Sequence, residues 1–456
     1  MFNLQKIIPN GISCGIKYLL YLFIFLLPWQ TRWIIFDPRI NNQVWEYGRI
    51  SLYSFDIIFF IIFFLFLIKF FAGKRKEKIE KINWKLVIIF ITLFLYYFIS
   101  FVVADNKLIN FYWFLRIIQG VFLVLILYKI NLDKIKAVWV FILSVSLSAI
   151  LGISQFLTQS VFACKWLGLA SHSAGMFGDS VVEFAGERWL RAYGSFPHPN
   201  ILAGFLIIAL ILIFQFLIPN IKILKYKLLS YFLTLLLITS LFFTFSRASW
   251  LVFAIVILLS FYYLIKNKSN KKNLLFYYFI TLLLLIIFCI IYFPLVKTRI
   301  IGTERLEVKS SIERMSAYGQ AFKIISATGG PASGWKNNLW LGTGLGNYTV
   351  ELQKIYPNRT AYFYQPAHNV YLLVLAEIGV IGVIFIVLLL YYLVSSVQCS
   401  VSVRILQYKG LFLCFYILFF LFFFDHFWYT LPSGLLVVFL IFGFLKQKKE
   451  APSVFK

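Results

Sequence analysis

Apolar stretches of about 20 residues recur along this chain of 456 residues, and they limit its fold more than any other feature. A helix of that length crosses the ~30 Å hydrocarbon core of a bilayer. Only 13% of the residues are charged, against roughly 25% in soluble domains. We predict an all-α, polytopic membrane helix bundle, one integral domain over 1–456. The expected spans, about twelve, are 17–36, 55–71, 84–103, 111–129, 136–158, 199–218, 228–245, 248–265, 274–295, 368–397, 405–424 and 428–445.

The net charge of +26 would suggest nucleic acid as the partner of a soluble chain. Here the lysines gather in the connections that follow every second span, whereas the other connections are mixed or acidic. The positive-inside rule places basic connections in the cytoplasm. We therefore predict cytoplasmic termini, two long extracytoplasmic loops at 159–198 and 296–367, the second of them carrying short helices, and no nucleic-acid partner.

The longer loop, 296–367, contains SSIERMSAYGQAFKIISA, in which Ile312, Met315, Phe322 and Ile325 recur with helical spacing. This spacing predicts an amphipathic surface helix. The glycine-rich segment LWLGTGLGNY comes next. No strand of a βαβ unit precedes it, so it does not predict a nucleotide site. Neither CxxC nor HExxH occurs, and we expect no metal and no cofactor.

Polar residues gather where three spans begin on the predicted outer side. Helix N-termini have unpaired N–H groups and a partial positive charge, and they bind anions. The planar guanidinium of arginine suits phosphate oxygens. We therefore predict a phosphate or diphosphate site made by Arg191, His198 and Asn200 before the sixth span, Ser246 and Arg247 before the eighth, and His368 and Asn369 at the tenth.

Each of these residues also has a structural interpretation. Arg191 and Arg247 would reach lipid head groups as snorkelling side chains. His198, next to a proline, would cap its helix, and Ser246 would cap the eighth span. His368 would then be an interfacial histidine without a chemical role.

Three further polar residues lie near the outer ends of other spans. Arg116 lies a turn or two inside the fourth span, where it either joins the site or pairs with a carbonyl group. Asp425 and His426 follow the eleventh span. They either bind substrate or form a salt-bridged loop.

Four elements, in this order, resemble the O-antigen ligase and O-antigen polymerase superfamily. RAYGSFPHPNILAGFL is similar to the arginine and HPN signature that opens its shared core, and FSRASWL is similar to its SRGAWL element. ERMSAYGQAF followed by LWLGTGLGNY resembles its loop pattern, with Arg314 as the loop arginine. HNVYLLVLAEIGVIG fits the ligase pattern at His368, Asn369, Gly379 and Gly382. GGPASGWKNN, at 329–338, departs from the pattern and is expected to reshape acceptor binding.

The resemblance implies a multi-pass glycosyltransferase of the cytoplasmic (inner) membrane, with its active site facing the periplasm or the exterior. The donor would be a glycan linked to undecaprenyl diphosphate, and neither metal nor nucleotide would be needed. A ligase passes the glycan to lipid A–core in lipopolysaccharide biosynthesis, whereas a polymerase passes it to a carrier-linked repeat of a cell-envelope polysaccharide. Arg191 and Arg247 would contact the diphosphate, and His368 would lie near the acceptor hydroxyl. Arg314 would bind substrate without a defined role.

The residues agree with this chemistry. Arginines and helix N-termini stabilise the charge that grows on a diphosphate leaving group. A histidine takes the proton of an attacking hydroxyl near neutral pH. We therefore predict an O-antigen ligase-like enzyme, with the polymerase as the alternative. A polysaccharide or lipid transporter is the alternative from another class, but transporters place polar sites near the midplane of repeated halves, and we find no repeat.

Overall fold

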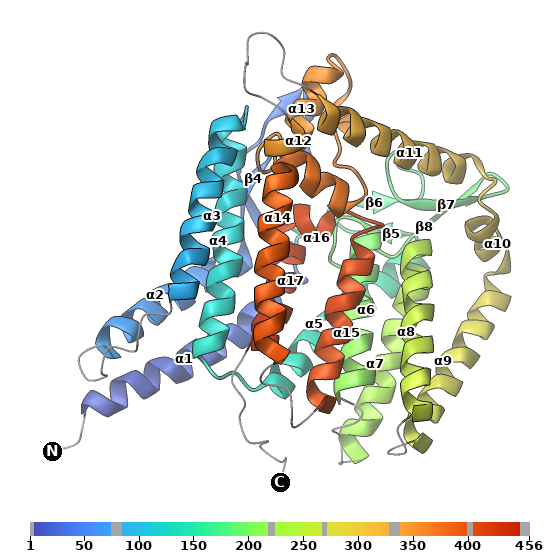
Figure 1. The fold of residues 1–456 in the computed structure, drawn as a ribbon. Coiled ribbons are helices and arrows are strands. Elements are labelled where there is room, and N and C mark those ends of the chain that lie inside the picture. The colour runs from blue at the N-terminus through green and yellow to red at the C-terminus, as the bar shows by residue number, and fades with distance from the viewer. Residues whose placement is uncertain are drawn as a thin grey trace.

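A computed structural model describes residues 4–73, 84–217, 224–266, 271–327, 338–398 and 405–446. Its long helices run mostly side by side (Figure 1). Each of the predicted spans overlaps one of them: α1 (Leu4–Leu26), α2 (Ser54–Gly73), α3 (Trp84–Val103), α4 (Lys107–Lys129), α5 (Lys134–Thr158), α6 (Pro199–Ile211), α7 (Leu224–Phe243), α8 (Arg247–Lys266), α9 (Lys271–Ile291), α14 (Val370–Gln398), α15 (Ile405–Leu421) and α17 (Pro432–Lys446).

Five described helices are long and apolar enough to cross a membrane, and these stretches are Ser54–Phe71, Lys107–Lys129, Lys134–Thr158, Lys225–Phe243 and Val370–Leu388. α9 and its bent continuation would make a sixth span. Shorter apolar helices occupy the places of the remaining predicted spans. A mostly helical fold with five or six candidate membrane spans among the described residues is therefore confirmed, while the total of twelve spans stays a prediction.

The predicted first span, 17–36, is wrong in its second half. α1 ends at Leu26, and β1 (Arg32–Phe36) pairs antiparallel with β4 (Ile50–Tyr53). Pro28 lies between them, and a proline cannot supply the N–H that would continue the helix. Apolar character alone does not separate a short strand from a helix.

The described residues also contain four two-stranded antiparallel sheets, which the all-α prediction missed. Besides β1 and β4, the pairs are β2 (Arg39–Ile40) with β3 (Gln43–Val44), β5 (Ser160–Val161) with β6 (His172–Ser173), and β7 (Val181–Phe184) with β8 (Glu187–Leu190). Ala185 and Gly186 join β7 to β8 with φ of 50° and 85°. Positive φ at both turn residues is the geometry of a tight type I′ hairpin.

The loop between α9 and α14 carries short helices, as predicted: α10 (Phe293–Ile301), α11 (Arg305–Ser326), α12 (Asn338–Leu341) and α13 (Tyr348–Ile355). It lies at the same end of the bundle as β5 to β8, with α11 across that end, and α17 finishes at the opposite end (Figure 1). Part of the basic connections that orient the chain, including residues 74–81, falls outside the described residues.

α11 confirms the predicted surface helix but not its buried face. Ile312, Met315 and Phe322 are 62%, 69% and 61% exposed. The face that packs against the protein instead contains Glu307, Ala321, Ile324 and Ile325. The helical spacing predicted an apolar face on α11, but most of that face is exposed in the tertiary structure.

The glycine pattern before α13 makes a close backbone contact with α14. Gly379, with φ of 62°, interrupts α14, and the N–H of Gly344 donates to the carbonyl of Glu377 at 2.9 Å. A Cβ at Gly342 would lie only 2.2 Å from that same carbonyl oxygen. The buried Glu377 carboxylate accepts from the N–H of Gly346 at 2.8 Å and the hydroxyl of Tyr429 at 2.7 Å. Glu377 thus faces the interior of the bundle.

α6 is the central helix, and it positions the site. All its residues from Ile201 to Ile211 are buried in the main apolar core. A Cβ at Gly204 would lie 2.7 Å from the ring of Phe427, so the helix packs tightly against the segment before α17. The N-terminus of α6 follows β8 and so lies at the end of the bundle that carries β5 to β8.

Candidate functional site

Arg191, at the end of β8, is a buried arginine with no carboxylate among its hydrogen-bond partners. Its side chain donates from Nε to the carbonyl of Thr244 at 2.6 Å and from Nη2 to Oδ1 of Asn200 at 2.7 Å. Nη1 has no hydrogen-bond partner among the described residues. Burial, followed by the positive charge of Arg299, lowers the pKa of Arg191. The structure therefore holds a buried guanidinium without a hydrogen-bonded carboxylate at the mouth of α6.

Asn200 connects Arg191 to an acidic residue that is distant in the sequence. Its Nδ2 donates to Oδ2 of Asp425 at 3.1 Å. The other carboxylate oxygen, Oδ1, lies 3.4 Å from Nδ1 of His368 and accepts from the N–H of His426 at 2.9 Å. Arg191, Asn200, Asp425 and His368 thus form one continuous hydrogen-bonded chain, which we call the Arg–His chain.

Asp425 is ionised in this arrangement. Burial by itself would raise the pKa of its carboxyl group, but the hydrogen bond to His368 and the nearby imidazoles lower it below the usual range. A carboxylate at Nδ1 favours the tautomer in which Nδ1 carries the proton. Nε2 of His368 is then free to accept a proton.

His198 caps α6. Its Nδ1 accepts the N–H of Asn200 at 3.1 Å, and its Nε2 bonds to the hydroxyl of Ser180 at 2.9 Å. Because Nδ1 is an acceptor, the ring is neutral, and burial together with the charge of Arg191 lowers the pKa to about 3. The capping interpretation of His198 is therefore confirmed, and it holds Asn200 in place.

Arg247 begins α8 beside a second charged group. Arg299 donates from Nε and Nη2 to the carbonyl of Phe245, at 2.9 and 2.6 Å, and pairs with Glu307. Nη2 of Arg247 lies 3.4 Å from the same Glu307 carboxylate, and its side chain is 34% exposed. One buried carboxylate therefore faces two arginines, and Arg247 remains accessible.

Sequence reasoning missed Arg299 and Glu307. They lie on different helices of the outer loop, α10 and α11, which Gly302 separates with φ of 72°. No periodicity connects the two residues, and the charge of each is ordinary for a loop. Only the tertiary structure brings them to the turn before Arg247.

Arg314, on α11, has no hydrogen bond or ion pair among the described residues. Its charge contributes, after burial, to the lowered pKa of Arg191 and of Arg299, which places it near both. Four arginines therefore surround this end of the bundle, with Glu307 and Asp425 as their acidic neighbours.

The remaining predicted residues are mainly structural or border the site. Oδ1 of Asn369 accepts the N–H of Leu372 at 3.1 Å and caps α14. The hydroxyl of Ser246 donates to the hydroxyl of Ser249 at 3.0 Å, where we had expected it to accept a backbone N–H of α8. His426 bonds through Nδ1 to the hydroxyl of Thr430 at 2.6 Å. A small cavity lies between the ends of α6 and α8 and is lined partly by Asn200, Ser246, Ser249 and Asp425.

Arg116 lies in a different cluster. Its guanidinium pairs with Asp56 and donates to Gln119, to Tyr112 and to the carbonyl of Ser51. None of these partners belongs to the Arg–His chain. The structure thus gives Arg116 a carboxylate partner inside the bundle, rather than only the carbonyl that we had considered.

His368, Asp425 and His426 offer ligand atoms within 4.8 Å of one another, a spacing that a metal ion also accepts. The donor set is already engaged, however, because Asp425 accepts from Asn200 and from a backbone N–H, and His426 bonds to Thr430. We therefore interpret the group as a hydrogen-bonded network.

The structure defines a multi-pass helical membrane protein with an arginine-rich site at one end of its bundle. Residues 232–387 match the family described as O-antigen ligase, from within α7 to within α14. This match supports a relationship to the O-antigen ligase and polymerase type of glycosyltransferase in the broad sense. No curated protein gives a significant match. The resemblance seen in the sequence motifs is thereby confirmed.

The matched segment contains only part of the site. Arg247 and His368 lie within it, whereas Arg191, Asn200 and Asp425 lie outside. The segment 329–338, which departs from the family pattern, lies outside the described residues except for Asn338.

Proposed function

We propose that this protein transfers a glycan from undecaprenyl diphosphate to a hydroxyl group of an acceptor, as a ligase acting on lipid A–core or a comparable glycan. The observation that carries this proposal is the Arg–His chain. At one end of the chain, Arg191 is suited to bind an anion. At the other end, His368 is suited to accept a proton. A sugar transfer from a diphosphate carrier needs both at the same time.

The donor end consists of the arginines. Nη1 of Arg191, the exposed part of Arg247 and the unpaired Arg314 are available to diphosphate oxygens. The N-terminus of α8, where Arg247 lies, adds a partial positive charge. When the bond between the anomeric carbon and the phosphate oxygen breaks, the electron pair stays on the diphosphate. These charges stabilise that leaving group.

The acceptor end is His368. Asp425 holds the proton on Nδ1, so that Nε2 receives the proton of the attacking hydroxyl as the new bond to the anomeric carbon forms. Asp425 is a positioning residue, because it acts through His368. The 3.4 Å separation in the free protein is expected to shorten when substrates bind.

The site would lie on the outer face of the cytoplasmic membrane, with both termini in the cytoplasm. Phe177, in the loop before β7, is 93% exposed and suits a cysteine label. A membrane-impermeant thiol reagent should label Phe177→Cys in intact spheroplasts of a strain whose protein lacks other accessible cysteines. Labelling only after the membrane is opened would reverse the orientation.

His368→Gln tests the chemistry, because glutamine keeps a hydrogen bond but cannot act as a base in this range. We expect transfer at saturating substrates to fall about a hundredfold or more. The loss of activity on the acidic side, measured from about pH 5.5 to 8.5, should also disappear.

His172→Gln is the matched control, because His172 also pairs with an aspartate, Asp179 at 2.6 Å, outside the site. It should retain the parental rate and pH profile. A near-parental rate and pH profile in His368→Gln would remove His368 from the chemistry.

The acceptor is tested separately with purified protein. Lipid A–core, a carrier-linked repeat and a glycosylation peptide are offered with the same donor. Transfer to lipid A–core supports a ligase, and transfer only to the carrier-linked repeat makes the protein an O-antigen polymerase. Movement of the glycan across vesicles without transfer would make it a transporter.

A further inference from the structure

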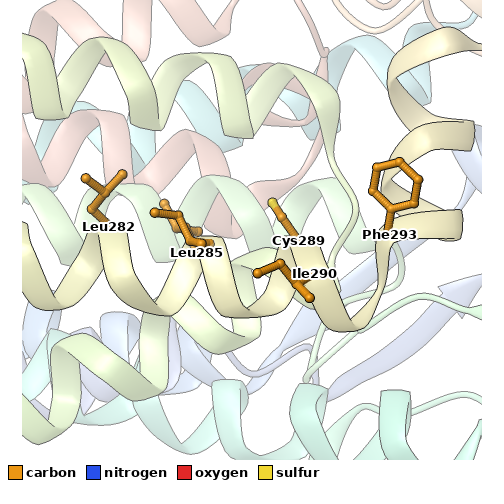
Figure 2. Close-up of a pocket in the computed structure, with 6 residues that line it drawn as sticks. Leu282, Leu285, Cys289, Ile290 and Phe293 are labelled. Atoms are coloured by element: carbon orange, nitrogen blue, oxygen red, sulfur yellow. The ribbon is translucent and has the colours of Figure 1, made fainter.

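An apolar groove of about 510 Å³ lies on the outer part of α9. It is formed where α9 ends at Ile291 and the chain continues from Phe293 at an angle of 93°. Figure 2 shows Leu282, Leu285, Cys289 and Ile290 along α9, and Phe293 beyond the turn. With Ile286 they are the lining residues, and all of them are apolar.

The groove is separate from the core contact of α9. Leu284, Phe288 and Tyr292 pack against the main core and do not line the groove, and Leu285 lies at the border because it does both. In contrast, Leu282, Ile290 and Phe293 are 60%, 70% and 60% exposed. The bend turns a lipid-facing surface into a concave one, which a straight helix would not offer.

The same bent segment leads to the arginines of the site. α10 ends at Gly302, where an added Cβ would lie 3.5 Å from Nη1 of Arg247. α10 also carries Arg299, which binds Glu307 and the turn before α8. One continuous element therefore presents an apolar groove at one end and guanidinium groups at the other. A ligand that covers both must have an anionic head and an apolar tail.

We propose that this groove holds part of the polyprenyl tail of the donor while its diphosphate lies at Arg247. The proposal rests on the proposed function, because it requires a polyprenyl diphosphate as the donor. Side chains and lipid tails are equally apolar, so the tail gains little hydrophobic free energy from leaving the bilayer. Packing in a shape that fits a methyl-branched chain supplies the preference instead.

Filling the groove tests the proposal. Cys289→Trp and Ile286→Trp place an indole in the space for the tail. We expect each to lower kcat/KM for a glycan on undecaprenyl diphosphate about tenfold, mainly through KM. The rate with a single-isoprene diphosphate donor should stay the same, because so short a tail does not reach Cys289.

Ile287→Trp is the matched control. Ile287 is 41% exposed on the same helix at the same depth, but it does not line the groove. It should leave both donors unaffected. An unchanged ratio between the two donors in the groove variants, or an equal loss in Ile287→Trp, would overturn the proposal.

A binding measurement separates this proposal from the proposed function. Undecaprenyl diphosphate with a photoreactive group in its tail is cross-linked to the parent protein, and no transfer is needed. Labelling is expected on the lining residues between 282 and 293, and not on Ile287. If an equal amount of phospholipid abolishes this labelling, the groove binds ordinary lipids and the proposal is refuted. If neither donor is used but labelling occurs, the proposed function fails while the tail site stands.

Discussion

Arg116 and Arg191 are equally buried, each 6% exposed, but their surroundings differ. Arg116 pairs with Asp56, whose other contacts include Gln119, so its charge is cancelled inside the bundle. The guanidinium of Arg191 contacts a carbonyl and an amide oxygen, and none of its hydrogen-bond partners among the described residues is a carboxylate. Buried charges are stable when paired. The absence of a directly bonded carboxylate at Arg191 is consistent with the anion site that we propose.

The comparison distinguishes two functions for the same residue type. The Arg116 cluster connects α4 to α2 and to the carbonyl of Ser51 in β4. The Arg191 cluster connects β8, α6 and the segment after α15. We expect loss of Arg116 to lower the stability of the fold. We expect loss of an arginine of the proposed site, Arg191 or Arg247, to lower the rate of transfer.

Arg116→Ala should give the largest effect. It leaves the Asp56 carboxylate buried and uncompensated, which lowers the free energy of unfolding by about 3–5 kcal/mol. Thermal unfolding in detergent measures the loss. The double variant Arg116→Met with Asp56→Leu should recover most of it, because an apolar pair replaces both charges. A stable Arg116→Ala protein without transfer activity would instead move Arg116 into the site.

Arg247→Ala should lower transfer about a hundredfold to a thousandfold, because it removes one donor to the leaving diphosphate. Its melting temperature should change little, since the side chain is partly exposed and its contact with Glu307 is long. Arg247→Lys should restore part of the activity, because a point charge does not make the bidentate contact. Full activity in Arg247→Ala would return this residue to a contact with lipid head groups.

Asn200→Ala interrupts the Arg–His chain and should lower transfer about tenfold to a hundredfold, the size expected for a residue that orients a reacting group. Its pH profile should shift, because Asp425 loses a donor. Asn110→Ala is the control, since Asn110 is also buried and donates to Ser100 at 3.1 Å outside the chain. Equal pH profiles in Asn200→Ala and the parent would show that the bridge only supports the fold.

The smallest effect concerns stability against pH. Folded His198 has a pKa near 3, below the ordinary value of 6.5. Above pH 6.5, His198 is neutral in both the folded and the unfolded protein. Below pH 6.5, His198 takes up a proton in the unfolded chain but not in the folded protein. Stability therefore falls as the pH falls, by about 1.4 kcal/mol between about pH 7.5 and 5.5.

His198→Asn should lack this part of the acid loss, because asparagine keeps the helix cap without titrating. Thermal unfolding of both proteins at the two pH values checks the difference. Equal acid losses in parent and variant would show that His198 is charged in the folded protein, which its cap geometry does not allow.

The sequence by itself determined the helices, the family and the local caps. Apolar length predicts a membrane helix, and the HPN and SRASWL motifs carry Arg191, His198 and Arg247 in short segments. The hairpin at Ala185–Gly186 was not predicted, because alanine is not among the residues that favour positive φ in a two-residue turn. These features are local, because each depends on neighbours within a few residues.

Only the tertiary structure decided which charges meet. Asp425 lies 225 residues from Asn200, and Asp56 lies 60 residues from Arg116. The sequence did show an arginine and an aspartate inside apolar spans, a signal for a pair that we did not use. In a bilayer, lipid is as apolar as the protein core, so hydrophobic pattern does not show which face of a helix packs inward. The partners of Arg191, the outward stripe of α11 and the groove on α9 therefore follow from packing alone.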